Sequence, residues 1–200
     1  MKLIIATKNE GKLREIKKIM RGINIPVISL NELDRKFRIK ENGKTFLENA
    51  LKKTIPVSKF YKDDYVVGED SGLEVGCLGG KPGVYSKRYS GKGATDKKNN
   101  LKILKALKGV DSKLRKACFC CWLVLLKDAK LVKTFDGKLS GLISEEIRGN
   151  SGFGYDPIFY LSKYRKTVAQ ITLDKKNSIS HRAKAFNKLR EYLKGLRKKF

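Results

Sequence analysis

The chain has 200 residues, with 46 Lys or Arg against 20 Asp or Glu, giving a formal net charge of +26. Its hydrophobic fraction of 40%, with nine Phe and eight Tyr, is typical of a folded globular protein and excludes a disordered chain. The longest apolar run, 117–126, is about half as long as a membrane-spanning helix, and the N-terminal run is too short for a signal peptide. We therefore expect a soluble, cytoplasmic protein without a membrane segment.

The positive charge has two interpretations. It can serve binding to nucleic acid or another polyanion. It can also reflect a lysine-rich composition, with the charge spread over solvated surfaces. The lysines recur along the whole chain, and no recognised nucleic-acid-binding motif accompanies them. We favour the second interpretation and expect no specific nucleic-acid partner.

Apolar runs and helical periodicity alternate along the chain. The first part predicts a strand at 2–7, a helix from Asn9 to Gly22, strands at 26–30 and 37–41, a helix capped by Thr45 and Glu48 that Pro56 ends or kinks, and a strand at 64–70. The second part predicts a loop at 76–94, a helix capped by Thr95, a central strand at 116–127, two strands across an Asp136-Gly137 turn, short strands at 158–161 and 167–172, and a last helix starting near Ser178 or Ser180. This mixture predicts an α/β fold.

The junction between the first strand and the first helix is a candidate anion site. Thr7, Asn9 and Lys12 lie where backbone N–H groups and the positive end of a helix dipole face a ligand. Lys12 adds a point charge. A plain structural role also fits, because Asn9 is a good helix cap.

Acidic residues are scarce, and Glu41, Glu69 and Asp70 stand out as candidate metal ligands. Glu69 and Asp70 follow an apolar strand and are expected at its C-terminal end, where α/β clefts form. Carboxylates without histidine favour Mg²⁺. An ordinary solvated strand end is the competing interpretation.

The cysteines do not suggest a metal site. Cys118, Cys120 and Cys121 lie in the apolar run and are expected to be buried thiols of a reducing compartment. Zinc would need paired cysteine spacing or nearby histidines, and the chain has a single His. Zinc is therefore not expected.

Two further segments combine glycine, aromatic and charged residues. In GFGYDP (152–157), Phe153 can lie against a flat ring and Asp156 can accept hydrogen bonds from base N–H groups, although a tight turn with Phe153 in the core is the alternative. His181 and Arg182 open the last helix, with Lys176 just before them, and supply donors for a carbonyl or phosphate oxygen. A lone His is more often structural, but its Ser and Arg neighbours favour a functional role.

Taken in order, these segments resemble the inosine triphosphate pyrophosphatase family, enzymes that hydrolyse non-standard purine nucleoside triphosphates. The matching motifs are Thr7-x-Asn9-x-x-Lys12, TFLENA with Lys53, EDSGLEV, PGVYS-x-RYSG, GFGYDP, and ISHR preceded by Lys176. They run from residue 2 to about 190 and so cover nearly the whole chain. Gly68-Glu69 stands where the family more usually has Ala-Asp, a change that keeps the carboxylate.

The resemblance implies a fold and an activity. The fold is α/β, with a mixed twisted sheet, flanking helices and two lobes around a long central cleft, so that residues 1–200 form a single domain. A homodimer is usual. The activity is Mg²⁺-dependent hydrolysis of ITP, dITP and XTP between the α and β phosphates, giving a nucleoside monophosphate and pyrophosphate.

The resemblance also implies roles for single residues. Asp70 is the catalytic base that orients the attacking water, Lys53 is a catalytic cation, and Glu41, Glu69 and Asp70 hold Mg²⁺. Phe153 stacks on the base, whose edge Asp156, His181 and Arg182 read. The other substrate-binding residues are Thr7, Asn9, Lys12, Ser71, Gly154, Tyr155 and Lys176.

Two other functions stay open. Maf-type nucleotide pyrophosphatases share the architecture and act on other bases, but the intact GFGYDP and SHR segments argue against them. A non-enzymatic, basic nucleic-acid-binding protein would explain the charge. It would not explain the retained acids, which repel phosphate unless a metal intervenes.

Overall fold

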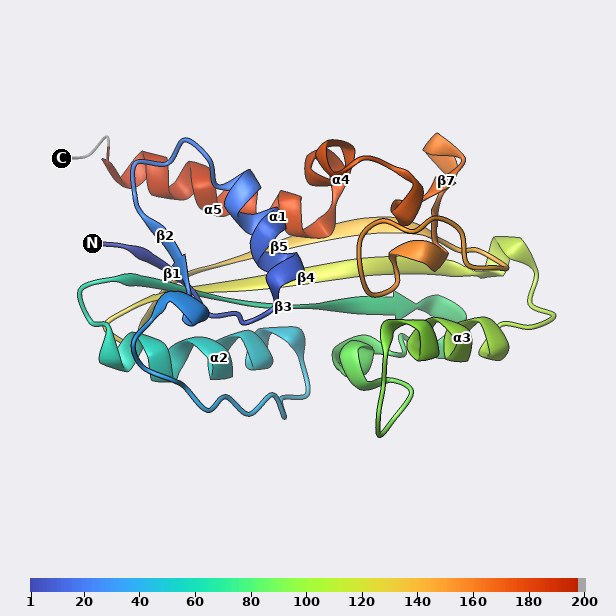
Figure 1. The fold of residues 1–200 in the computed structure, drawn as a ribbon, viewed down its shortest axis with the longest axis horizontal. Helices are drawn as coiled ribbons and strands as arrows, with labels where there is room; N and C mark the ends of the chain where they lie inside the picture. Colours follow the sequence, from blue (N-terminus) through green and yellow to red (C-terminus); the bar gives the residue numbers. More distant parts are fainter. Residues whose placement is uncertain (198–200) are drawn as a thin grey trace. The chain divides into compact units, whose positions relative to one another are not determined.

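The computed structural model describes residues 1–197, in which strands and helices alternate as far as β4 (Lys116–Lys127), followed by three more strands and two helices (Figure 1). The strands are β1 (Leu3–Ile5), β2 (Val27–Ser29), β3 (Tyr65–Val75), β4 (Lys116–Lys127), β5 (Lys130–Ile143), β6 (Phe159–Leu161) and β7 (Lys166–Thr167). The helices are α1 (Glu10–Ile19), α2 (Phe46–Phe60), α3 (Asp96–Ala106), α4 (Leu173–Ile179) and α5 (His181–Arg197). The predicted α/β class is confirmed.

The strands form one seven-stranded sheet in the order β2-β1-β3-β4-β5-β6-β7. Strand β1 runs parallel to both of its neighbours, so that Leu3 lies opposite Val27 on one side and Tyr65 on the other. Strand β6 is antiparallel to β5 and to β7. The sheet is therefore mixed, as predicted.

The chain divides into two compact units. The first comprises Met1–Ser71, Cys121–Gly137 and the residues from His181 on, and the second comprises Gly72–Cys120 and Lys138–Ser180. Each unit has its own core: Ile16, Val67, Leu123 and Phe186 belong to that of the first, and Leu73, Ile103, Phe119 and Phe159 to that of the second. No helix within residues 1–197 is both long and apolar enough to cross a bilayer. That the chain acts as one domain stays a prediction.

Side-chain caps begin three helices where the sequence predicts them. The cap oxygens of Asn9, Thr45 and Thr95 accept hydrogen bonds from the backbone N–H groups of Lys12, Glu48 and Lys98, at 2.9, 3.1 and 3.2 Å. The Glu48 carboxylate accepts from the Lys44 N–H at 2.8 Å. In a capping box this carboxylate would accept from the Thr45 N–H instead, so only the Thr45 half of the predicted box is formed.

Two predictions in the first unit need correction. The helix that was predicted to end or kink at Pro56 does not end there, because α2 continues through the proline to Phe60. Val57 and Ser58 are fully buried directly after the proline, and their packing outweighs the one lost backbone hydrogen bond. Residues 37–41 form no strand. Phe37 and Ile39 pack against a small core cluster, which explains their alternation without strand pairing.

Strand β3 continues beyond the acidic pair at its predicted end. Leu73 and Val75 alternate into the core of the second unit, where both are fully buried, and this extends the strand to Val75. Glu69 and Asp70 therefore lie in the middle of β3, and the prediction that they end a strand is wrong. Neighbouring side chains on a strand point to opposite faces, so the two carboxylates separate.

Residues 131–143 belong to one continuous strand, β5, and the predicted turn at Asp136-Gly137 is wrong. The turn that joins β4 to β5 consists of Asp128 and Ala129, both with positive φ (48° and 57°). Gly137 has a different purpose. A Cβ atom there would lie 2.1 Å from the His181 carbonyl oxygen and 2.8 Å from the backbone nitrogen of Ala185, so glycine lets α5 approach the strand.

Gly137→Ala is expected to lower the free energy of unfolding by about 1–3 kcal/mol, because the new methyl group must displace backbone of α5. Urea denaturation measures this loss. Gly195→Ala is the control, because Gly195 lies in α5 with no atom within 4 Å of an added Cβ. A loss for Gly137→Ala no larger than the effect of Gly195→Ala would contradict the close-approach argument.

The chain around the last helices is partly as predicted. Strands β4 and β6 and the start of α5 near Ser180 are confirmed. The strand predicted at 167–172 reduces to Lys166–Thr167 before a 3₁₀ turn, and α4 was not predicted. Cys120 and Cys121 are buried as expected, whereas Cys118 is partly exposed.

Candidate functional site

Opposite faces of β3 carry two clusters of charged side chains in the first unit. The Glu69 cluster consists of Lys12, Glu15, Glu69 and Arg182, with Ser71 and Cys121 beside them. The Asp70 cluster consists of Glu41, Asn49, Lys53 and Asp70. Helices α1 and α5 supply one cluster, and α2 and the segment before it supply the other.

Arg182 is the centre of the Glu69 cluster. Its Nε and Nη2 donate to Glu69 Oε1 at 3.1 and 2.9 Å, Nη2 also donates to Ser71 Oγ at 3.1 Å, and Nη1 donates to Glu15. Lys12 Nζ lies 3.4 Å from Glu69 Oε2. Arg182, Glu15 and Glu69 are each at most 3% exposed, so the two carboxylates compensate a fully buried guanidinium.

Burial and charge compete in this cluster. Burial alone would raise the pKa of Glu69, but Arg182 and Lys12 outweigh it and hold the pKa well below its ordinary value of 4.5. The pKa of Arg182 is raised, because Glu69 and Glu15 outweigh the opposing effect of burial. For Lys12 burial dominates, and its pKa is lowered despite the attraction of Glu69. Glu69 is thus an ionised carboxylate held in place by cations.

Lys53 joins the members of the Asp70 cluster. Its Nζ lies 2.7 Å from Asp70 Oδ1, 3.0 Å from Glu41 Oε2 and 3.0 Å from the Glu69 carbonyl oxygen. Asn49 Nδ2 donates to Asp70 Oδ2 at 3.1 Å, while its Oδ1 accepts from the Gly43 N–H at 2.8 Å. Burial would lower the pKa of Lys53, but Asp70 and Glu41 raise it, so Lys53 stays a cation.

The Asp70 cluster fits part of the predicted magnesium set. Within residues 1–197 no three acidic, His or Cys side chains converge as a complete ligand group. Glu41 and Asp70 nevertheless face one ammonium group, and Mg²⁺ usually takes one or two carboxylates together with substrate phosphates. Glu69 binds Arg182 and Lys12 instead, so the chemistry fits Glu41 and Asp70 better than the full triad.

The start of α1 organises the predicted anion site. The Asn9 N–H donates to Thr7 Oγ1 at 3.2 Å, and Asn9 Oδ1 caps the helix through the Lys12 N–H. Thr7 and Asn9 thus shape the loop, and Lys12 is the charged group that it presents. Their contact with substrate stays a prediction.

The second unit holds the other predicted residues in the Phe153 loop, residues 152–156. Asp156 Oδ2 accepts from the Phe153 N–H at 2.9 Å and from Lys176 Nζ. Lys176 Nζ also lies 4.6 Å from the centroid of the Phe153 ring. Gly152, with φ +81°, has no room for a Cβ, which would lie 2.1 Å from Asp156 Oδ2. The loop thus holds a partly exposed aromatic ring beside a buried ion pair.

Helix α3 clamps the backbone of the Phe153 loop. Asp96 Oδ2 accepts from the Gly154 N–H at 2.6 Å, and Asn100 Nδ2 donates to the Gly154 carbonyl at 3.0 Å. These residues are four apart and so share one face of the helix. Tyr155 is buried in the core, and its hydroxyl donates to the Ser86 carbonyl at 2.8 Å. Gly154 and Tyr155 thus anchor the loop.

Four residues of these sites were not singled out from the sequence: Glu15, Asn49, Asp96 and Asn100. For two of them, the helical spacing from a predicted site residue could have indicated the role. Asn49 precedes Lys53 by four residues, and Glu15 follows Lys12 by three, so each lies on the helix face of a predicted site residue. His181, at the start of α5, is buried. The base-edge roles of His181 and Arg182 stay predictions.

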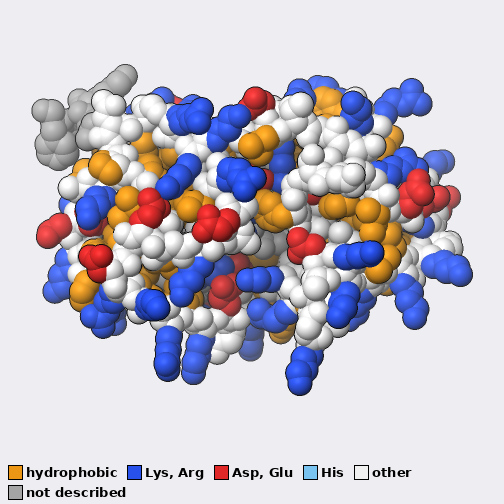
Figure 2. All heavy atoms as spheres, in the orientation of Figure 1, with side chains coloured by type: hydrophobic (Ala, Val, Ile, Leu, Met, Phe, Trp, Pro, Cys, Tyr) orange, Lys and Arg blue, Asp and Glu red, His pale blue; other side chains and the backbone are white. Residues whose placement is uncertain are grey.

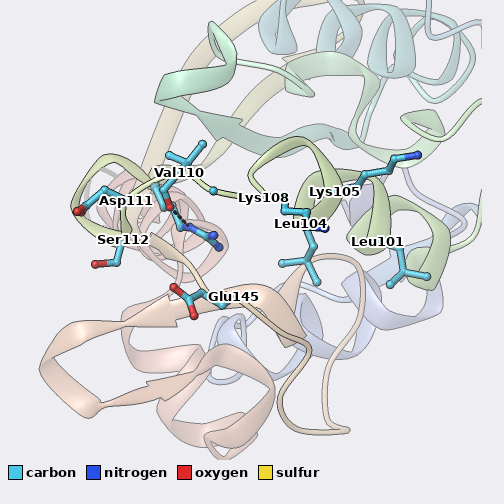
Figure 3. A pocket seen from close by; sticks show the side chains of 10 residues that line it. Leu101, Leu104, Lys105, Lys108, Val110, Asp111, Ser112 and Glu145 are labelled. Atoms are coloured by element: carbon cyan, nitrogen blue, oxygen red, sulfur yellow. Dashed lines mark hydrogen bonds between the residues drawn. The ribbon is translucent and has the colours of Figure 1, made fainter.

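The visible face and one cavity of the described residues bring no further predicted site residues together. Figure 2 shows Lys and Arg side chains scattered over the visible face with acidic side chains among them. A cavity of about 960 Å³ near the end of α3 is lined by Leu101, Leu104, Lys105, Lys108, Arg115 and Glu145, among others (Figure 3). No predicted site residue lines it. The Arg115 guanidinium donates to backbone carbonyls of Leu107, Val110 and Ser144, a structural role.

Residues 3–192 match the model of the Ham1 family. The chain belongs to the Ham1 family. Six motifs in order had indicated the inosine triphosphate pyrophosphatases, and that resemblance is confirmed.

Curated relatives match this Ham1-family chain along almost its full length. A Clostridium perfringens protein named dITP/XTP pyrophosphatase is 45% identical over 202 residues, covering 98% of this chain and 99% of the relative. A Bacillus subtilis protein of the same name is 45% identical over 190 residues, covering 95% and 96%.

Solved structures agree. The Staphylococcus aureus Ham1 protein has a TM-score of 0.86 at 40% identity, covering 98% of this chain and 100% of that one. A Coxiella burnetii HAM1 protein has a TM-score of 0.88 at 36% identity, covering 98% and 99%. The mixed seven-stranded sheet is thus a Ham1 architecture.

Proposed function

We propose that this chain is a dITP/XTP pyrophosphatase, a hydrolase that converts dITP, ITP and XTP to nucleoside monophosphates and pyrophosphate. The observation that carries the proposal is the 45% identity over 98% of the chain with a protein of that name. The buried Lys53–Asp70 pair and the aromatic Phe153 loop supply the chemistry such a reaction needs. The reaction would remove non-standard purine nucleotides from the nucleotide pool.

Asp70 is suited to act as the base in this reaction. Asn49 and Lys53 each hold one of its carboxylate oxygens, which fixes the group for orienting and deprotonating a water molecule. Lys53 and Lys12 are cations where charge develops on the phosphates. The lowered pKa of Lys12 reflects its buried site, and binding of a phosphate would favour its charged form.

We include Mg²⁺ in the proposal, with Glu41 and Asp70 as the residues that would hold it. When bound, it would neutralise phosphate charge, as divalent ions do in phosphoryl chemistry. Glu69 then has a separate role. Held by Arg182, it keeps Lys12 oriented and balances the charge of this buried cluster.

Base recognition is assigned to the Phe153 loop and to the start of α5. Phe153 would stack on the purine, and the Asp156–Lys176 pair would fix the loop that carries it. A hydrogen-bond donor facing the purine 6-position favours the carbonyl of hypoxanthine and xanthine over the amine of adenine. His181 and Arg182 remain the proposed donors.

Purified protein is expected to release pyrophosphate from dITP, ITP and XTP and to act much more slowly on ATP and GTP. Pyrophosphate and monophosphate are measured with and without Mg²⁺, which also tests the metal. A chelator should stop the reaction, and Mg²⁺ should restore it. Orthophosphate as first product, or equal rates on ATP, would refute the activity.

Asn100→Ala should raise KM for dITP by about 3- to 10-fold with little change in kcat, because the Gly154 carbonyl loses its donor and the Phe153 loop loosens. Steady-state kinetics measures both constants. Lys97→Ala is the matched control, an exposed residue in the same helix. An unchanged KM in Asn100→Ala would show that the clamp does not position the loop.

The proposal extends to a homodimer, as the resemblance implies, and to a location in the cytoplasm. Light scattering coupled to gel filtration tests the dimer directly. A monomer at micromolar concentration with full activity would remove the dimer from the proposal without affecting the reaction.

A further inference from the structure

An aromatic patch lies on the surface of the first unit, where the segment between β2 and α2 runs beside α2 (Figure 1). It consists of Arg35, Phe37, Phe60 and Tyr61, and we call it the Phe60 patch. The ring centroid of Phe60 is 5.0 Å from that of Tyr61 and 6.2 Å from that of Phe37, and both neighbouring rings meet it edge to face. The Arg35 guanidinium lies 4.4 Å from the centroid of the Phe60 ring.

Phe60 is exposed, although the rings beside it are anchored. Phe37 and Tyr61 pack against the core cluster that contains Leu30 and Val57, which holds the edges of the patch in place. Phe60 itself is 51% exposed, so about half of a large apolar side chain is in contact with water. The proposed hydrolysis uses none of the four residues of the patch. An exposed ring held by anchored neighbours is a preformed contact surface, which loses little freedom when a ligand binds.

Cations surround the Phe60 patch on both of its segments. Residues 34–40 and 59–64 together contain six Lys or Arg against three Asp. All six cations are exposed: Arg35, Lys36, Arg38, Lys40, Lys59 and Lys62. Of the acids, Asp64 lies 4.0 Å from the N-terminal ammonium group, and Asp34 and Asp63 are exposed. The patch therefore combines an aromatic platform with an excess of positive charge.

We propose that the Phe60 patch binds single-stranded nucleic acid without sequence preference, with a base stacked on Phe60 and the neighbouring cations on phosphates. Proteins bind single strands in this way, because aromatic rings stack on any base and cations follow the backbone. The Arg35 guanidinium beside the ring adds to such stacking. The site would use part of the net charge of +26, which hydrolysis of a nucleotide does not require.

A second copy of the chain fits the Phe60 patch less well. A two-fold interface brings the same patch of both copies together, so the excess of cations would face itself. A polyanion instead gains from each of these charges. Among polyanions, a nucleic acid also offers flat bases to the exposed ring, which acidic peptides and lipid head groups lack.

Fluorescence anisotropy with a labelled strand of 12 deoxythymidines tests the binding, since one such site covers roughly 4–16 nucleotides. The control ligand is an abasic strand of the same length, which keeps the phosphates and lacks the bases. The thymidine strand should bind at least about 5-fold more tightly, the smaller end of the effect of one stacked base. Equal affinity for the two strands, or binding of neither, would overturn the proposal.

Variants of Phe60 separate stacking from plain apolar contact. Phe60→Leu keeps an apolar side chain without an aromatic face, so it should weaken binding of the thymidine strand about 5-fold or more and leave the abasic strand unaffected. Phe60→Tyr keeps the ring and should stay within about 2-fold of the wild type. Wild-type affinity in Phe60→Leu would contradict stacking at this site.

Two matched double variants test the charge. Lys36→Gln with Arg38→Gln removes two cations beside the patch, and it should weaken binding and reduce the dependence of log Kd on log salt concentration by about 1.4, or about 0.7 for each phosphate contact. Lys97→Gln with Lys105→Gln removes two exposed cations of α3 in the second unit and should leave both quantities nearly unchanged. Equal losses in the two double variants would indicate diffuse attraction by the whole charge and would overturn the site.

Competition and molecular mass test the other occupants. Unlabelled thymidine strand should displace the labelled strand more effectively than oligoglutamate or vesicles containing phosphatidylserine. Stronger displacement by either competitor would overturn the assignment to nucleic acid. Light scattering coupled to gel filtration should give the same mass for wild type and Phe60→Leu. A dimer that Phe60→Leu dissociates would assign the patch to a second copy and refute the proposal.

Discussion

Asp70→Asn is expected to reduce kcat for dITP by at least about 100-fold, because the amide cannot accept the proton that the proposed base removes from water. The side chain keeps its shape and can still accept a hydrogen bond from Lys53. Lys53 also retains Glu41 and the Glu69 carbonyl, so the cluster keeps most of its contacts. The measurement is kcat at saturating dITP, with circular dichroism to show that the variant is folded.

The control for this variant is Asp63→Asn, an exposed acid just before β3, which should keep full activity. If Asp70→Asn retains more than about a tenth of kcat, it has lost less than about 1.4 kcal/mol of transition-state stabilisation, and the role of base is wrong. If Asp63→Asn loses activity to the same degree, the effect is one of overall charge.

Arg182→Ala should lower the free energy of unfolding by about 3–5 kcal/mol, the usual cost of removing one partner from a buried ion pair. Glu69 and Glu15 would then be buried without the guanidinium that both bind in the wild type, with Lys12 still 3.4 Å from Glu69. Urea denaturation at pH 7 measures the loss. Arg190→Ala, in the same helix but partly exposed, should cost less than about 1.5 kcal/mol.

A double variant shows whether unpaired charge is the cause. Adding Glu69→Gln to Arg182→Ala should restore part of the stability, because it removes one uncompensated carboxylate. Additive losses would contradict this explanation. The single variant Arg182→Ala also tests the proposed contact with the edge of the base. A loss of selectivity between dITP and ATP would indicate that Arg182 contacts the base as well.

The stability lost in Arg182→Ala should depend on pH in a direction that the pKa of Glu69 fixes. In the wild type the pKa of Glu69 is depressed on folding, so the stability it contributes is present above about 4.5 and declines as pH falls below that value. In Arg182→Ala we expect burial to outweigh the remaining attraction of Lys12 and to raise the pKa of Glu69. Protonation then removes the buried negative charge and its desolvation cost. The difference in unfolding free energy between wild type and variant should therefore shrink as pH falls below about 5.

The parts of the fold that the sequence predicts correctly depend mostly on short-range interactions. Asn9, Thr45 and Thr95 cap helices through their own short-range hydrogen bonds, so the sequence alone locates α1, α2 and α3. The clusters on β3 were partly predictable too, because Glu69 and Asp70 must point to opposite faces wherever the strand extends.

Long-range packing explains what was missed. Gly137 looked like a turn residue, but its purpose is set by α5, more than forty residues further along the chain. The real turn at Asp128 and Ala129 lacks glycine and gave no signal. Arg182 reads as a substrate donor in a motif, and only the folded chain reveals that Glu15 and Glu69 occupy its guanidinium.

The division of the chain between the two units determines the order in which the residues of each unit are synthesised. The backbone passes from one unit to the other after Ser71, Cys120, Gly137 and Ser180. A ribosome releases the N-terminal 71 residues first, yet Phe186 of their core and Arg182, the partner of buried Glu69, emerge last. The second unit has all of its residues by Ser180. The core of the first unit is therefore complete only when α5 has been made, and until then Glu69 lacks the guanidinium that binds it in the folded protein.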